Sequence, residues 1–127
     1  VVGKYSEKEV YKKIVGNGGF NAYLNTNDAR DVEKMIDNGD AHAKEVYDAF
    51  IYQVCKNVGA QAAVLDGKVD AIVVTGGIAY SKYVIEGIKN KVSWIAPITV
   101  YPGEDELLAL AQGALRVENG EEKAMEY

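Results

Sequence analysis

The chain has 127 residues, of which 48% are apolar, and its net charge is −5 at neutral pH. This length suits one domain, and the acidic balance argues against a nucleic-acid binder, which would present a cationic face. The sequence contains no run of 18 apolar residues and no signal-peptide pattern, and its single cysteine, Cys55, excludes an internal disulfide. We therefore expect a cytoplasmic protein without membrane or nucleic-acid partners. Because the chain opens at Val1 without an initiator methionine, we also expect either a processed protein or a piece of a longer one.

The first elements are marked by a capping pattern and a glycine-rich stop. Ser6, with Glu9 three residues later, is typical of a capping box and predicts a short helix that ends near Val15. Residues 16–19 (GNGG) end this helix. We expect Phe20–Leu24 to be a short extended segment.

Two further helices are predicted before the first strand. The polar run Thr26–Asp28 supplies capping side chains for a helix that reaches about Asp37. Asp40 is placed to cap the next helix, which we expect to continue to about Leu65. Apolar residues at spacings of three and four predict one buried face for this long helix. They are Val46, Tyr47, Phe50, Ile51, Val54, Cys55 and Val58.

The second half of the chain alternates strands and helices. Val69–Val74 is short and nearly all apolar, which is typical of a strand covered on both faces of a parallel sheet. Helices are expected over Ser81–Lys89 and Glu104–Val117, with a second strand at Pro97–Tyr101. This order predicts an α/β fold with a helix-strand-helix-strand-helix core and parallel strands. Because two strands are too few for a stable sheet, we expect further strands from elsewhere, Phe20–Leu24 among them.

A glycine loop follows the first predicted strand. Thr75, Gly76 and Gly77 lie where the strand ends, and the next helix starts near Ser81. Ligands of open α/β sheets bind at the carboxyl ends of strands, and glycines let a ligand approach the backbone closely. The loop is therefore interpreted as a ligand-binding site. The alternative is a strand-to-helix turn that needs glycine for its backbone angles alone.

Other polar segments are weaker candidates. Arg30, at the start of a predicted helix, is suited either to a phosphate or base or to a plain surface position. Glu104 and Asp105 open the last helix, where carboxylates either complement the helix dipole or hold Mg²⁺ through water. The single histidine, His42, is expected on the solvent side of its helix. Cys55 is expected to be inert core.

Three ordered motifs resemble the butyrate kinase branch of the acetate kinase family, over its C-terminal part. They are GGFNAYL with TNDARDV at 18–24 and 26–32, VDAIVVTGGIA at 69–79, and WIAP with YPGEDEL at 94–97 and 101–107. Residues 76–81 read GGIAYS where acetate kinases usually carry AGIGEN, which favours the butyrate branch. The resemblance covers essentially the whole chain.

The resemblance implies a fold, a reaction and a set of site residues. The implied fold is part of a ribonuclease H-like, actin-like ATPase domain, with ATP in a cleft between two such domains. The implied reaction transfers the γ-phosphoryl group of ATP, with Mg²⁺, to butanoate, and it also runs in reverse during fermentation. The nucleotide-binding residues that the resemblance implies are Thr75, Gly76, Gly77, Ile78 and Ser81 on one wall and Asp28, Ala29 and Arg30 on the other. Asp105, with Glu104, is implied as the Mg²⁺ position.

The resemblance also implies that parts of the enzyme are missing. The family's phosphate loops and substrate-binding residues lie outside these 127 residues, so we expect 1–127 to be the C-terminal nucleotide-binding part, inactive alone. We expect the whole protein to be a homo-oligomer. Two alternatives stay open: a nucleotide-binding regulatory domain of the same superfamily without kinase chemistry, and an interaction fragment that pairs through a sheet edge.

Overall fold

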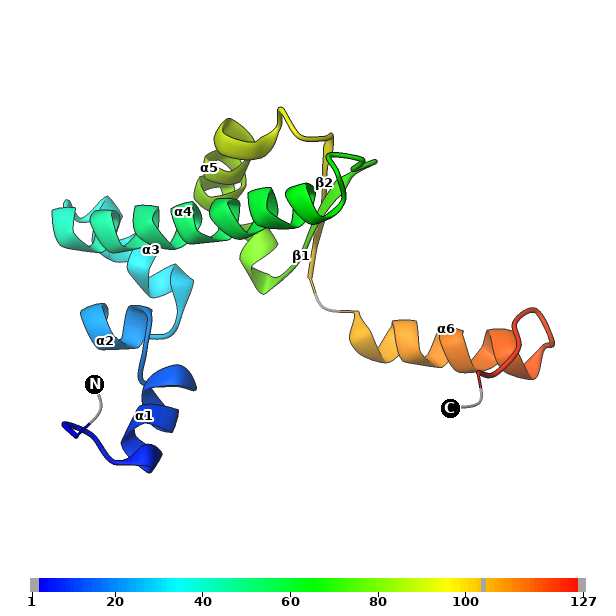
Figure 1. Cartoon of the computed structure of the whole chain (residues 1–127), viewed down its shortest axis with the longest axis horizontal. Coiled ribbons are helices and arrows are strands. Elements are labelled where there is room, and N and C mark those ends of the chain that lie inside the picture. The colour runs from blue at the N-terminus through cyan, green and yellow to red at the C-terminus, as the bar shows by residue number, and fades with distance from the viewer. Residues whose placement is uncertain (1–2, 104, 126–127) are drawn as a thin grey trace.

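The computed structural model describes residues 3–103 and 105–125. They form six α-helices, one 3₁₀ helix and a parallel sheet of two strands (Figure 1). In chain order the elements are α1 (Glu7–Ile14), α2 (Phe20–Leu24), α3 (Ala29–Asp37), α4 (Ala41–Val64), β1 (Ile72–Gly76), η1, a 3₁₀ helix (Gly77–Tyr80), α5 (Lys82–Val92), β2 (Ile98–Pro102) and α6 (Glu106–Glu118). The predicted order of helices and strands from Asp40 onward is confirmed, as is the parallel pairing.

Four helices begin directly after a polar residue whose side chain caps the helix. In each of them, the side chain of the preceding residue accepts a hydrogen bond from a backbone N–H two or three residues later, which satisfies a donor that the helix leaves free. These residues are Ser6 before α1, Asp28 before α3, Asp40 before α4 and Ser81 before α5. The capping box of Ser6 and Glu9 is complete, so this prediction is confirmed.

The sheet differs in detail from its prediction. β1 pairs with β2 in register from Ile72 opposite Ile98 to Gly76 opposite Pro102, and α5 makes the crossover between them. The predicted strand Val69–Val74 therefore starts three residues too early and ends two too soon. This chain by itself covers only one of the two faces, because Val73 is 57% exposed while its neighbours in β1 are half-buried. Within the described residues, helices cover only one face of β1.

The core lies between α4 and α5, with α3 against the N-terminal half of α4. The buried residues of α4 recur every four positions, which confirms the predicted apolar face. The central cluster is Val32, Ala43, Tyr47, Ile51, Cys55, Val84, Ile88 and Val92. This packing fixes α3 and the start of α5 on the same side of α4, and it thereby sets the distance between the two predicted binding segments.

The expectation of an extended segment at Phe20–Leu24 is wrong, because these residues form the one-turn helix α2. The Phe20 ring packs at 5.5 Å from the Tyr47 ring and 5.1 Å from the Phe50 ring, both on α4. A helical turn brings Phe20 and Leu24, four residues apart, onto one face, and both pack on the core cluster. Tertiary contact with α4 thus decides the local conformation.

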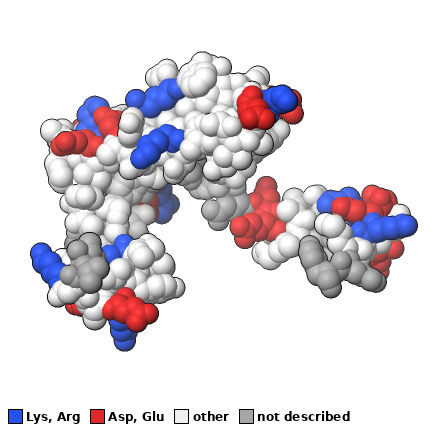
Figure 2. Space-filling view, viewed as in Figure 1, with Lys and Arg blue, Asp and Glu red and all other residues white. Residues whose placement is uncertain are grey.

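Helix α6 extends away from the rest of the molecule (Figure 1). It starts at Glu106, two residues after the predicted start, and Glu104 lies outside the described residues. Figure 2 shows mostly uncharged side chains along the middle of α6. Four leucines of this helix are exposed: Leu107, Leu108, Leu110 and Leu115. None of the helices among the described residues is long and apolar enough to cross a membrane.

Candidate functional site

An open cavity of about 690 Å³ lies where the start of α3 faces η1. One wall comes from the segment around the α3 N-terminus, and the other comes from the loop that follows β1. The lining residues are Asn27, Asp28, Ala29, Arg30 and Glu33 on the first wall and Gly77, Ile78, Tyr80 and Ser81 on the second. The structure thus brings together the two segments that the sequence analysis singled out, although some fifty residues separate them.

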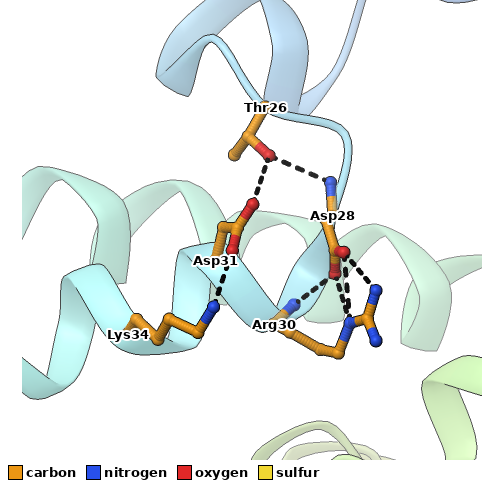
Figure 3. A network of polar contacts seen from close by, with 5 residues as sticks. All are labelled: Thr26, Asp28, Arg30, Asp31 and Lys34. Carbon is orange, nitrogen blue, oxygen red and sulfur yellow. Dashed lines mark hydrogen bonds and ion pairs between the residues drawn. The ribbon is translucent and has the colours of Figure 1, made fainter.

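A polar network holds the first wall (Figure 3). The Asp28 carboxylate accepts the backbone N–H of Arg30 at 2.9 Å and caps α3. The same carboxylate accepts the Arg30 guanidinium through both of its oxygens, at 2.6 to 3.1 Å. Thr26 accepts the Asp28 backbone N–H at 3.1 Å and donates to Asp31. Arg30 is therefore positioned at the rim of the cavity, although its side chain is 84% exposed.

The charge of Asp28 follows from this pairing. The Arg30 side chain and then its backbone N–H lower the pKa of the Asp28 carboxyl to about 2. Hydrogen bonds that favour the ionised form produce such a shift. Asp28 is therefore negative throughout the physiological range, and the guanidinium remains tied to it.

The second wall depends on the geometry of the glycine loop. Gly76 has φ +81°, a conformation that side chains other than glycine rarely adopt. Its N–H and C=O pair with the C=O and N–H of Gly103 at 3.1 and 3.2 Å. Thr75 and Gly76 belong to β1 and do not line the cavity, whereas Gly77, Ile78 and Ser81 do. Within the predicted set, Thr75 and Gly76 thus direct the loop rather than face the cavity.

Side chains of α3, of α4 and of the residue that caps α5 meet at the cavity wall. The Glu33 carboxylate on α3 accepts the Tyr47 hydroxyl of α4 at 2.8 Å, and it also accepts the Ser81 hydroxyl. Ser81 in turn accepts the backbone N–H of Val84 and so caps α5. Burial and the hydrogen bond to Glu33 raise the pKa of Tyr47 to about 12, although the Ser81 hydroxyl opposes this shift. Tyr47 therefore remains a hydrogen-bond donor at neutral pH.

Sequence reasoning missed Glu33 and Tyr80. Glu33 follows Ala29 by four residues in α3, so the two residues share a face of the helix, and this spacing alone was a signal for it. Tyr80 carried no comparable signal. Its hydroxyl lies beside Gly103, where a Cβ atom would stand 3.0 Å from it. That contact joins η1 to the residue after β2, a proximity that only the folded chain produces.

The predicted Mg²⁺ position lies only partly within the described residues. Glu104 lies outside them, and Asp105 is exposed and makes no side-chain cap to α6. Among residues 3–103 and 105–125, no three His, Cys, Asp or Glu side chains are grouped closely enough to hold a metal ion. His42 is exposed, as predicted. Cys55 is buried as predicted, and burial raises the pKa of its thiol, so the unreactive protonated form is favoured.

Comparison with known proteins identifies the family. The model of the acetokinase family matches residues 3–96. The chain belongs to this family. A probable butyrate kinase of Clostridium botulinum strain Alaska E43 is 59% identical over 125 residues, and one from strain Eklund 17B is 58% identical. Butyrate kinase 2 of Clostridium acetobutylicum is 59% identical over the same length. Each alignment covers 98% of this chain.

The chain spans about a third of the length of these relatives, since the matched residues make up 35% of each of them. The cavity between α3 and η1 is formed within residues 27–81, which the family match includes. Family membership agrees with the predicted actin-like ATPase fold, of which the parallel strands with their helical crossover form a part.

Proposed function

We propose that these residues form the nucleotide-binding part of a longer ATP-dependent carboxylate kinase. Its reaction would be butanoate + ATP = butanoyl phosphate + ADP, run in either direction in fermentation. The chain would supply the adenosine side of the ATP site, through Asp28, Ala29 and Arg30 on one wall and Gly77, Ile78 and Ser81 on the other. Thr75 and Gly76 would belong to the same loop and direct it toward the nucleotide. A cytoplasmic location and a homo-oligomeric state belong to the same proposal.

The observation that carries the proposal is the shared cavity of α3 and η1. Its second wall combines the half-buried Ile78 with the exposed backbone of Gly77, which together suit the flat, apolar faces of a base. Its rim carries Arg30, a cation that is suited to phosphate or to stacking on a base. The identity of 58–59% to butyrate kinases supports the choice of acceptor.

The groups that the reaction needs would come partly from this chain and partly from residues outside it. Phosphoryl transfer requires that the attacking oxygen, the γ-phosphate and the leaving group are held in line and that their charge is neutralised. In the described residues, Arg30 is the only cation that lines the cavity. The carboxylate site and the groups around the γ-phosphate would therefore lie elsewhere, and this chain alone would be inactive. Mg²⁺ would bind mainly to the phosphates, with Asp105 and Glu104 as proposed carboxylate ligands.

An exchange experiment tests this function. The 125 matching residues of Clostridium acetobutylicum butyrate kinase 2 are replaced by this chain, and butanoyl phosphate formation from ATP and butanoate is measured. We expect an active chimera and an inactive isolated chain. A folded chimera that binds ATP without transferring phosphate would favour the regulatory alternative. A chimera that phosphorylates a sugar and no carboxylate would contradict the proposed acceptor.

Gly77 is a position where a larger side chain would enter the cavity. A Cβ atom built at Gly77 meets nothing within 4 Å, and its φ is not positive, so the backbone accepts a residue other than glycine there. In the active chimera, Gly77→Leu is expected to raise the KM for ATP by about tenfold or more, since it fills space that the base would occupy. The matched control is Gly59→Leu on α4, which also meets nothing within 4 Å and lies outside the cavity.

A further inference from the structure

Glu33 is the one carboxylate of the cavity that is not engaged by a cation. Asp28 is paired with Arg30, whereas the partners of Glu33 within the described residues are two neutral hydroxyls. Both hydroxyls, from Tyr47 and Ser81, donate to the same oxygen, Oε1. This arrangement gives the two carboxylate oxygens different roles.

The second oxygen, Oε2, is available to a ligand. No hydroxyl or N–H of the described residues donates to it, and Glu33 is half-buried in the cavity wall. The described residues contain no buried side-chain oxygen or nitrogen without a hydrogen-bond partner. Oε2 is therefore reached by solvent, and Glu33 is one of the residues that line the cavity.

The orientation of this carboxylate is fixed before a ligand arrives. Tyr47 is completely buried in the core, and its hydroxyl is held by the packing of α4. Ser81 is fixed by the hydrogen bond that caps α5, at 3.1 Å from the Val84 nitrogen. Because two fixed donors hold Oε1, Oε2 has little freedom to move. A ligand can therefore bind Oε2 with little further loss of side-chain conformational entropy.

The chemistry of a carboxylate selects the part of the nucleotide that it meets. An ionised carboxylate only accepts hydrogen bonds, and it repels phosphate. Its partner in a nucleotide is therefore an uncharged donor, which is either a sugar hydroxyl or an amino group of the base. The apolar surface of the cavity is provided by Ala29 and Ile78, which suits the base, whereas Glu33 and Ser81 form a polar corner. The polar corner suits the sugar.

We propose that Glu33 Oε2 accepts a hydrogen bond from a ribose hydroxyl of the nucleotide, and that Glu33 thereby selects ribonucleotides over deoxyribonucleotides. This inference rests on the proposed function, since it assigns the sugar end of the same site. It adds a residue that connects nucleotide binding to α3, α4 and the cap of α5. Ser81 acts through Glu33 as a positioning residue, because its hydroxyl is already used by the carboxylate and by the helix cap.

The test uses the 127-residue chain and nucleosides, which need no phosphate-binding residues. Amide NMR spectra are recorded while adenosine, 2′-deoxyadenosine, 3′-deoxyadenosine or purine riboside, which lacks the amino group, is added up to millimolar concentration. The wild-type chain is expected to bind adenosine and purine riboside alike, and one deoxynucleoside about tenfold or more weakly, because a hydrogen bond to a charged group is lost. In Glu33→Gln, adenosine is expected to bind as weakly as that deoxynucleoside.

The controls separate binding from folding. Glu45→Gln changes an exposed glutamate of α4 outside the cavity and is expected to leave all four affinities unchanged. If Glu33→Gln does not fold, intermolecular NOEs between ribose protons and the Glu33 side chain in the wild-type chain decide the question, and their absence from the bound state overturns the proposal.

The remaining outcomes distinguish this inference from the proposed function. Equal binding of adenosine and both deoxynucleosides overturns the ribose assignment, and so does a loss of affinity that is confined to purine riboside. An active chimera would still support the proposed kinase function in either case. If none of the four nucleosides shifts the amide resonances of the chain, the inference is overturned. The activity of the chimera then decides the proposed function independently.

Discussion

Tyr47 connects the core of the molecule to the cavity wall. It is fully buried, stacks on Phe50 and Tyr83, and donates its hydroxyl to Glu33. Because the pKa of Tyr47 is raised to about 12 in the folded chain, the folded state holds this proton more tightly than the unfolded state does. Its contribution to the free energy of unfolding is complete below pH 10 and is lost as the pH rises toward 12.

Alkaline unfolding tests this linkage. Between pH 9 and pH 12, the free energy of unfolding of the wild-type chain is expected to fall by on the order of 2 kcal/mol more than that of Tyr47→Phe, which has no phenol to ionise. Urea denaturation at each pH gives both curves. Parallel curves would show that the tyrosine ionises equally in the folded and unfolded states.

Asp28 produces the opposite pH dependence. Its pKa is lowered to about 2, so its stabilising contribution is present above about pH 4 and is lost as the pH falls toward 2. Asp28→Asn keeps a good capping side chain but removes the ion pair with Arg30. At pH 7 this variant is expected to melt roughly 1–5 °C lower than the wild type. The difference should shrink at pH 2, and a difference that is constant with pH would contradict the assignment.

At the scale of elements, the contact between α4 and α5 depends on glycine at one position. A Cβ atom at Gly87 of α5 would stand 3.0 Å from both Cγ2 and Cδ1 of Ile51, which is buried in α4. This close approach brings α5, and with it the Ser81 cap, against the same helix that carries Tyr47. The distance between α4 and α5 therefore sets the geometry of the hydrogen bonds that Tyr47 and Ser81 donate to Glu33.

Two glycine-to-alanine variants separate helix propensity from this packing. Gly59 lies in α4 with open space around its Cα, so Gly59→Ala is expected to stabilise the chain by about 0.5–1 kcal/mol. Gly87→Ala has the same gain in propensity but crowds Ile51. The free energy of unfolding of Gly87→Ala is expected to be at least about 1 kcal/mol lower than that of Gly59→Ala. Equal stabilisation of both variants, measured by urea denaturation, would show that α5 has room for the methyl group.

At the scale of the whole molecule, α6 and the exposed face of the sheet stand apart from the core. The leucines of α6 are exposed, and α6 has no extensive contact with another element among the described residues. The exposed side chains of Val73 and Tyr101 lie on the two strands. The chain spans about a third of its relatives, so the proposed longer protein has ample residues outside this chain to cover these surfaces.

Removal of α6 tests this independence. A chain that ends at Gly103 is expected to keep its melting temperature to within about 2 °C, because surface segments away from the core contribute little to stability. Differential scanning calorimetry at several concentrations separates this effect from self-association. A decrease of more than about 5 °C at every concentration would show that α6 packs on the α4–α5 core in solution.

The candidate site was predictable in part. The segments around Asp28 and Gly77 were recognisable because capping residues and strand-terminal glycines have local sequence patterns. Glu33 and Tyr80 were not recognised, because their roles depend on partners at a distance in the chain. Ser81 is 48 residues from Glu33, and no spacing along the chain encodes that hydrogen bond.

The sequence by itself determined the helix starts at Ser6, Asp28, Asp40 and Ser81, the order of helices and strands from Asp40 onward, and the family. Each of these follows from residues close together in the chain or from motifs in a fixed order. Only the tertiary structure decided that Phe20–Leu24 is helical, that one face of β1 is uncovered, and that the Ser81 hydroxyl donates to Glu33 at the cavity wall. These features depend on the packing of α4 against α2, α3 and α5, and packing between distant segments overrides local preference.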